Sequence, residues 1–358
     1  MIEEADGGPL RIAMLAPPWI PVPAPAYGGI EEVVRLLCDG LTARGHHVTL
    51  YAPPGSESDA EVVTLLDESH PDEIEKAVFE SDHVSRAFAE IDAAAERGEP
   101  FDVVHDHVGH TALAMADRLA APLVHTLHGP FTEDASRFYA EHGPKACIVG
   151  ISQAQLDSGP RDMGGGRVVH NPIETDEWPF SADKDDYVLW IGRMSPDKGP
   201  HRAIAAAREA GVRLLLAGPV QTGQDEFFTE EVEPLLGDGV EYVGEADAER
   251  KRELYLHARA LLMPIRWPEP FGLVMVESLV CGTPVIAFAE GSVPEVVRDG
   301  VTGFVVDDEH AMAEAIGRVG DLDPAACRRD CEERFSVDAV VRGYEGVYRA
   351  AMRRRVAA

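Results

Sequence analysis

The amino-acid sequence predicts an α/β protein with two parallel-sheet domains. Short apolar runs, typical of buried strands, alternate with segments of helical periodicity along most of the 358 residues. The alternation is interrupted at residues 171–186, a charged stretch with two prolines and no periodicity, and then starts again. A chain of this length that is 45% hydrophobic can also form two separate cores.

The first domain is expected to span residues 1–175 and opens with a strand–helix–strand unit. The strands are predicted at 11–16 and 47–52, and the helix at 30–43, where valines and leucines recur at helical spacing. Crossovers of this kind make neighbouring strands parallel and place ligands beyond their carboxyl ends. The other predicted elements are strands at 102–105, 122–126, 146–150 and 167–170, and a helix at 72–97.

The second domain is expected to span residues 186–335, and the last segment, 336–358, carries a long helix at 337–355. Another helix is predicted at 200–210, and a third starts near Phe271 or Gly272 and ends before Gly282. The strands of this domain are predicted at 187–191, 212–217, 240–243, 260–263, 285–287 and 303–306.

The charge balance excludes several classes of partner. The formal net charge is −31, from 63 acidic and 32 basic residues, so DNA and RNA would be repelled and nucleic-acid binding is not expected. Association with an anionic membrane is not expected for the same reason. The five scattered cysteines form no CxxC pair, and the acidic start of the chain lacks the features of a signal peptide. We therefore expect a reduced, cytoplasmic protein.

The segment 269–277 combines a loop carboxylate with a helix that carries a second one. Pro270 precedes the helix, and Gly272 lets a ligand approach the backbone where free N–H groups favour a phosphate. Glu277 lies five residues further on, roughly 7.5 Å along the helix axis. That distance suits a carboxylate that reaches a ribose while a diphosphate lies at the helix start, and Glu269 can then reach other hydroxyls.

A second loop, at 192–199, brings two cations to the end of a strand. Arg193 and Lys198 lie between the predicted strand 187–191 and the helix 200–210. An arginine fork and a lysine point charge next to a helix start suit a diphosphate. Lysine is scarce in this acidic chain, which favours a function for Lys198 over ordinary surface charge.

Histidines gather at the ends of two first-domain strands, at positions 105, 107, 110, 125 and 128. Zinc ligation is disfavoured because the residues come from two loops without cysteines, so no metal site is predicted. His128 directly follows a strand in a Gly-Pro turn, where ligand contacts are common. A hydrogen bond from His128 to the backbone is an equally good interpretation of the pattern.

Taken together, these motifs resemble the family 4 retaining glycosyltransferases of GT-B fold, in the superfamily of glycogen synthase and sucrose synthase. The resemblance covers essentially the whole chain and is carried by segments 192–199, 269–277 and 294–303, by Tyr27-Gly28-Gly29, and by 126–129. It implies two Rossmann-like domains with an interdomain cleft, and a C-terminal helix that crosses back to the N-terminal domain. It also implies a hexosyltransferase-type enzyme that uses a UDP-, GDP- or ADP-sugar.

The resemblance also implies roles for individual residues. Arg193 and Lys198 would hold the diphosphate, Glu277 the ribose and Glu269 the sugar, with His128 near the hydroxymethyl group of that sugar. The base would meet backbone near Val243, and Gly28 and Gly29 would let backbone approach phosphate or acceptor. The predicted catalytic residues are His128, Arg193, Lys198 and Glu269. The predicted donor-binding residues are Gly28, Gly29, Arg193, Lys198, Val243, Glu269, Phe271, Gly272, Leu273 and Glu277.

In the mechanism that the resemblance implies, the acceptor attacks the face from which the diphosphate leaves. The leaving phosphate takes the acceptor proton, so no protein nucleophile, metal or cofactor is expected beyond the donor. Two alternatives stay open: an NDP-sugar epimerase of the same fold, and a non-catalytic protein that binds nucleotide sugars. The acceptor is a small molecule or a glycan that the sequence does not identify. Residues 291–293, Gly-Ser-Val, depart from the Gly-Gly that many relatives carry before Pro-Glu.

Overall fold

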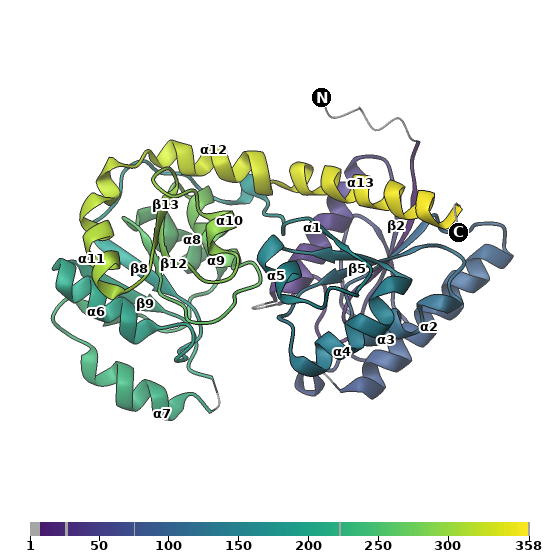
Figure 1. Ribbon diagram of the computed structural model, residues 1–358, viewed down its shortest axis with the longest axis horizontal. Helices are drawn as coiled ribbons and strands as arrows, with labels where there is room; N and C mark the ends of the chain where they lie inside the picture. The colour runs from purple at the N-terminus through teal and green to yellow at the C-terminus, as the bar shows by residue number, and fades with distance from the viewer. Residues whose placement is uncertain (1–7, 26–27, 75, 222, 357–358) are drawn as a thin grey trace. The chain divides into compact units, whose positions relative to one another are not determined.

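The computed structural model describes residues 8–25, 28–74, 76–221 and 223–356. Contacts within the chain divide it into two units (Figure 1). The first unit comprises residues 1–172 and 337–358, and the second comprises residues 173–336. Residues 173–186, most of the charged stretch that interrupts the predicted alternation, therefore belong to the second unit. In the described part of the chain, no helix is both long enough and apolar enough to cross a bilayer.

The first unit is built on a seven-stranded sheet in which every neighbouring pair is parallel. The strand order is β3-β2-β1-β4-β5-β6-β7. The strands are β1 Arg11–Leu15, β2 His47–Tyr51, β3 Glu61–Val63, β4 Val103–Asp106, β5 Leu123–Leu127, β6 Cys147–Gly150 and β7 Gly166–Val168. The helices are α1 Gly29–Ala43, α2 Ala77–Glu96, α3 His110–Ala114, α4 Glu133–His142, α5 Gln153–Ser158 and α13 Val337–Val356.

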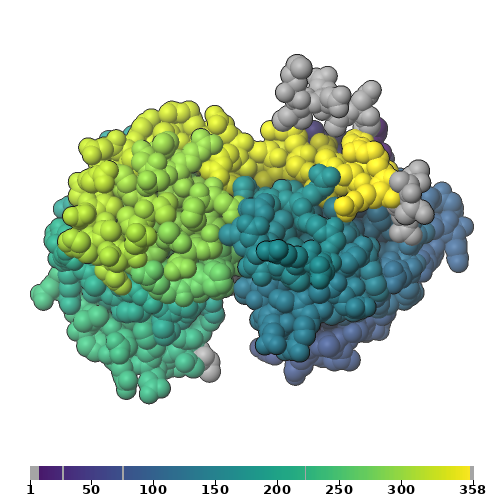
Figure 2. Space-filling model, viewed as in Figure 1, coloured from purple at the N-terminus to yellow at the C-terminus, as the bar shows by residue number. Residues whose placement is uncertain are grey.

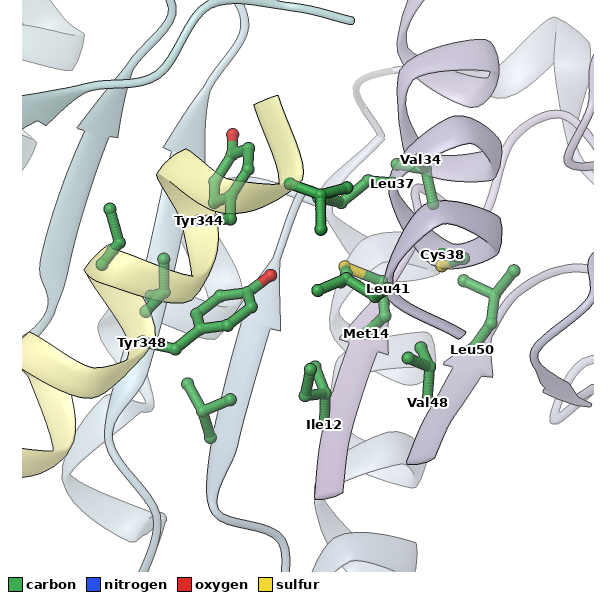
Figure 3. Close-up of a cluster of buried hydrophobic side chains, with 14 of the residues drawn as sticks. Ile12, Met14, Val34, Leu37, Cys38, Leu41, Val48, Leu50, Tyr344 and Tyr348 are labelled. Carbon is green, nitrogen blue, oxygen red and sulfur yellow. The ribbon is translucent and has the colours of Figure 1, made fainter. Parts of the chain in front are cut away.

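Alternating residues of β1 face the two helical layers of this unit. Ile12 and Met14 pack with α1 and α13, whereas Ala13 and Leu15 pack with α2 and α3. The first of these clusters includes Tyr344 and Tyr348 of the C-terminal helix, next to Leu37 and Leu41 of α1 (Figure 3). In the space-filling view, the yellow surface of α13 lies along the first unit (Figure 2). The predicted return of the last helix to the N-terminal domain is thereby confirmed.

The second unit repeats the architecture with six parallel strands in the order β10-β9-β8-β11-β12-β13. The strands are β8 Tyr187–Ile191, β9 Arg213–Ala217, β10 Val240–Tyr242, β11 Leu261–Met263, β12 Val285–Phe288 and β13 Gly303–Val306. The main helices are α6 Pro200–Ala210, α8 Ala248–His257, α9 Leu273–Val280, α11 Glu309–Arg318 and α12 Pro324–Phe335, with shorter α7 Asp225–Phe227 and α10 Val293–Val296. Leu214 and Leu216 of β9 join Ile204 of α6 and Ile316 of α11 in one buried cluster.

The first unit differs from the sequence prediction at one predicted helix and at one strand that was not predicted. The predicted helix at 72–97 is a 3-10 turn, Pro71–Glu73, followed by α2 from Ala77. Ile74 and Lys76 have extended ψ angles of 136° and 111°, which separate the two helical segments. The short strand β3, Glu61–Val63, lies in a stretch that has no strand pattern in the sequence, and it pairs with β2 at the sheet edge.

Candidate active site

The site lies where the strand order of the second sheet reverses. The sheet runs outward from β8 and β11 in opposite directions, so the loops that follow these two strands diverge. The loop after β8 carries Arg193 and Lys198, and the loop after β11 carries Glu269. Strand order therefore brings together residues that are 71 positions apart in the sequence.

Lys198 and Glu269 form a close ion pair at this point. The Nζ atom of Lys198 is 2.5 Å from Oε2 of Glu269. The same ammonium lies 4.4 Å from the centre of the Trp267 ring, within range of a cation–π interaction. The two charged side chains are only 20% and 11% exposed, so their attraction is weakly screened by solvent. Trp267 was not among the predicted site residues.

Residues 291–292 pack against the loop that carries Glu269 and hold its backbone in place. The Ser292 hydroxyl donates to the Phe271 carbonyl at 2.8 Å, and the Ser292 amide donates to the Glu269 carbonyl at 3.0 Å. Gly291 has φ +52°, and a Cβ atom on it would lie 2.3 Å from the Glu269 carbonyl oxygen. The Gly-Ser pair that departs from the family pattern therefore fixes the backbone of the Glu269 loop.

Helix α9 begins at Leu273, one or two residues later than predicted. Gly272 precedes it in the left-handed conformation, with φ +76° and ψ +71°, which glycine adopts without strain. The side chain of Phe271 is buried and packs edge-on against Phe335. The first amides of a helix have no partner within the helix, so α9 presents N–H donors beside Glu269. This geometry suits an anion.

Glu277 is the fifth residue of α9 and has two partners on α8. Lys251 Nζ is 2.6 Å from Oε1 of Glu277, and the Tyr255 hydroxyl donates to Oε2 at 3.0 Å. The Glu277 side chain is 12% exposed. The sequence gives no motif that selects Lys251 or Tyr255, although Lys251 is one of the five lysines in the chain.

Arg193 and Val243 are two further predicted donor contacts, and the structure offers a side chain of the first and a backbone group of the second. The Arg193 side chain is exposed at the start of its loop, next to the strand end. The Val243 amide donates to the Leu216 carbonyl at 2.9 Å, as part of the sheet. Of its two backbone polar groups, Val243 can therefore offer a base only the carbonyl, and the Gly244 carbonyl already accepts from the Gly218 amide.

In the first unit, His128 forms a pair with a second histidine. Nδ1 of His107 and Nε2 of His128 are 2.8 Å apart, so one ring donates its N–H to the other. Burial, with a smaller effect of His125, lowers the pKa of His128 to about 3, and burial lowers that of His107 well below its ordinary value. Both rings are neutral at pH 7. His128 is thus suited to exchanging hydrogen bonds and not to acting as a charged acid.

Two of the other histidines at these strand ends, His105 and His125, have ordinary hydrogen-bond partners. Nε2 of His105 is 2.8 Å from the Thr126 hydroxyl, and its Nδ1 is 2.7 Å from Tyr348 of α13. Nδ1 of His125 donates to Asp106 at 2.6 Å. Across the described ranges, no group of three or more His, Cys, Asp or Glu side chains is placed to hold a metal ion.

Gly28, the residue that precedes α1, has a packing explanation in the structure. A Cβ atom on Gly28 would lie 2.3 Å from that of Ala24 and 2.6 Å from Oε2 of Glu31. Glu31, buried in the first turn of α1, already places a carboxylate there, and burial raises its pKa. A ligand contact of Gly28 and Gly29 stays a prediction, and Tyr27 lies outside the described residues.

Comparison with known proteins identifies the class. The model described as "Glycosyltransferase Family 4" matches residues 27–177, and the model described as "Glycosyl transferases group 1" matches residues 173–333. Between them they account for both units. The chain therefore belongs to the family 4 (group 1) glycosyltransferases, which transfer a sugar from a nucleoside-diphosphate sugar. The predicted family, enzyme class and GT-B fold are thereby confirmed.

Individual relatives align over nearly their whole length. The D-inositol 3-phosphate glycosyltransferase of Mycolicibacterium smegmatis is 29% identical over 395 residues, covering 94% of this chain and 91% of the relative. The structure of AviGT4, a glycosyltransferase involved in avilamycin A biosynthesis, has 26% identity and a TM-score of 0.72, covering 96% and 98%. Anabaena HepE, solved with UDP and glucose, has 19% identity and a TM-score of 0.71, covering 95% and 100%, and shares the fold.

Proposed function

We propose that this enzyme is a retaining, metal-independent glycosyltransferase whose donor binds to the second unit, at the loops after β8 and β11 and the start of α9. The observation that carries the proposal is the ion pair of Lys198 with Glu269 beside that helix start. The pair brings the Lys198 ammonium and the Glu269 carboxylate together near the start of α9. Glu277 lies further along α9.

Lys198 and Arg193 are assigned to the diphosphate. An ammonium group has three N–H donors, and Glu269 accepts one, so Lys198 can bridge the carboxylate and a phosphate oxygen. The exposed guanidinium of Arg193 can supply a two-pronged contact to the same diphosphate. Amides of Gly272 and Leu273 add donors and the positive end of the α9 dipole. Together they stabilise the charge that develops on the leaving group.

The sugar and the nucleoside lie on opposite sides of the diphosphate in this proposal. Glu269 accepts hydrogen bonds from the sugar hydroxyls, and Glu277 accepts them from the ribose. The carbonyl of Val243 meets the base. His128 reaches the hydroxymethyl side of the sugar, and its neutral ring donates or accepts a hydrogen bond there without placing a positive charge next to the oxocarbenium-like centre.

The reaction then breaks the bond between the anomeric carbon and the diphosphate oxygen. The acceptor oxygen bonds to the anomeric carbon from the same face, and its proton passes to the departing diphosphate. The nucleoside diphosphate leaves protonated, and the configuration is retained. Glu269 lies in an ion pair and Glu277 in another, so neither carboxylate is assigned the role of a nucleophile.

The acceptor is sought among small polar molecules. The relative from M. smegmatis acts, by its name, on D-inositol 3-phosphate, and this compound is the first acceptor to test. We further propose that the enzyme acts in the cytoplasm. The five cysteines are unpaired and buried, which fits a reducing compartment.

A ligand-binding screen followed by product analysis tests the proposal. UDP-, GDP- and ADP-glucose are compared for the increase in melting temperature that each produces, because a ligand that binds the folded state stabilises it. The best donor is then incubated with D-inositol 3-phosphate, and separately without acceptor, in EDTA. We expect NMR to show an α-linked product, or first-formed α-glucose on slow hydrolysis. A β product, an epimerised sugar, or loss of turnover in EDTA contradicts the proposal.

A further inference from the structure

Each glutamate of segment 269–277 has a lysine partner, although the chain contains five lysines in all. Lys198 pairs with Glu269, and Lys251 pairs with Glu277. The first pair belongs to the diphosphate site described above. In the second pair, Lys251 has no role in the proposed mechanism, and the side chains of Lys251 and Glu277 are mostly shielded from solvent, at 22% and 12% exposure.

Lys251 and Tyr255 approach Glu277 from one face of α8. They are four residues apart, so their side chains are neighbours on that face. Tyr255 is fully buried, and its ring meets Trp178 edge-on at 6.0 Å, while the Lys251 ammonium lies 5.8 Å from the same Trp178 ring. The Lys251 amide donates to the carbonyl of Asp247, and the side chain of Asp247 caps the start of α8. Both groups are therefore held in place before any ligand arrives.

We propose that Lys251 and Tyr255 are positioning residues that orient the Glu277 carboxylate toward the ribose, and that they thereby set the preference for ribonucleotide over deoxyribonucleotide donors. The inference rests on the proposed function, because it takes Glu277 as the ribose contact. An ionised carboxylate has about four acceptor positions. Lys251 uses one on Oε1 and Tyr255 uses one on Oε2, which leaves one on each oxygen for two adjacent ribose hydroxyls.

Charge gives Lys251 a second effect on the donor. The protein carries a net charge of −31, and the donor is itself an anion. An unpaired Glu277 carboxylate, roughly 7.5 Å along the helix axis from the diphosphate position, would repel the donor. The Lys251 ammonium, 2.6 Å from Oε1, neutralises that carboxylate without occupying all of its acceptor positions.

The experiment measures how strongly the enzyme distinguishes ribose hydroxyls. Dissociation constants are determined by calorimetry for UDP, GDP and ADP, each beside its 2′-deoxy and 3′-deoxy form. The variants are Lys251→Met, Lys251→Arg, Tyr255→Phe and Glu277→Gln. Arg250→Met is the matched control, because it removes one positive charge from the same helix at an exposed residue that pairs with Glu253. The melting temperature of each variant without ligand shows whether it is folded.

We expect the wild type to prefer the ribonucleotide by about 10-fold or more, as is typical of hydrogen bonds to a charged group. Lys251→Met and Tyr255→Phe should reduce that preference to about threefold or less, Lys251→Arg should restore part of it, and Arg250→Met should keep it. In kinetics, Lys251→Met should raise the donor KM and leave kcat nearly unchanged. If Lys251→Met fails to fold, Tyr255→Phe, which leaves the ion pair intact, carries the test.

Three results overturn the inference and can be told apart. If Glu277→Gln abolishes the preference while Lys251→Met and Tyr255→Phe keep it, Glu277 contacts ribose without help from α8, and only the positioning role fails. If the wild type itself does not distinguish ribose from deoxyribose, or binds none of the three nucleotides, the proposed donor site fails and the inference fails with it. A loss of thermal stability without a change in preference assigns Lys251 to packing alone.

Discussion

Replacement of Lys198 by methionine tests the centre of the proposed site. The substitution keeps most of the side-chain volume and removes the ammonium that lies 2.5 Å from Glu269 and 4.4 Å from the Trp267 ring. Two separate effects follow from the structure. The departing diphosphate loses a cation that would stabilise it, and the carboxylate of Glu269 loses its ion-pair partner.

The two effects have different expected sizes. Loss of one preorganised group that stabilises developing charge lowers kcat by about 10²–10³, or about 2.7–4 kcal/mol. Breaking a fully buried ion pair costs about 3–5 kcal/mol, but solvent reaches both of these side chains, so we expect a loss of about 1–2 kcal/mol in unfolding free energy. For a unit of this size that corresponds to a decrease in melting temperature of roughly 3–6 °C.

The assay follows release of nucleoside diphosphate at saturating donor, together with thermal unfolding of the same preparations. Lys145→Met is the control, because Lys145 pairs with Asp117 at 2.7 Å in the first unit, whereas the donor loops belong to the second unit. The double variant Lys198→Met/Glu269→Gln should recover part of the lost stability but none of the lost activity, since it removes the unpaired charge. If Lys198→Met keeps kcat within about threefold of the wild type, the assignment of the diphosphate site is wrong.

Three further predictions follow from the structure. Gly291→Ala should lower the melting temperature and donor affinity more than Gly300→Ala does, because both positions have positive φ but only at Gly291 would a Cβ meet the Glu269 carbonyl, at 2.3 Å; equal effects of the two substitutions would contradict this. Burial lowers the pKa of His83 to about 4, so the unfolded chain binds the extra proton; the contribution of His83 to stability decreases by about 2 kcal/mol as pH falls from above 6.5 to pH 5, and pH-dependent melting curves should show a decrease smaller by that amount in His83→Leu than in the wild type. Because of the net charge of −31, raising NaCl from 0.01 to 1 M shortens the screening length from about 30 to about 3 Å and should raise the melting temperature; a decrease would show that self-repulsion does not limit stability.

The elements that the sequence predicts best are those with strong local signals. Strand β8, Tyr187–Ile191, and helix α6, Pro200–Ala210, have the predicted bounds, because an uninterrupted apolar run and a Gly-Pro start mark them. The strand β3 is different, since it owes its conformation to pairing with β2 and carries no pattern of its own. A three-residue edge strand is decided by its neighbour and not by its own residues.

The local chemistry of the site was also readable from the sequence. Gly272 before a helix, a carboxylate five residues inside it, and two cations in a strand–helix loop are properties of short segments, and the structure places them as those segments suggest. What each residue does in the reaction stays a prediction. The sequence alone determined that such groups exist and that each lies at the end of a strand or the start of a helix.

Only the tertiary structure decided which of these groups meet. Lys198 and Glu269 are 71 residues apart and are joined because β8 and β11 are neighbours in the sheet, an order that no local pattern specifies. Lys251 and Glu277 meet because α8 and α9 pack side by side, and Ser292 reaches Phe271 because the loop after β12 folds under the loop after β11. An ion pair or a hydrogen bond acts over a few ångströms, so it depends on how the chain is folded in space and not on spacing along the sequence.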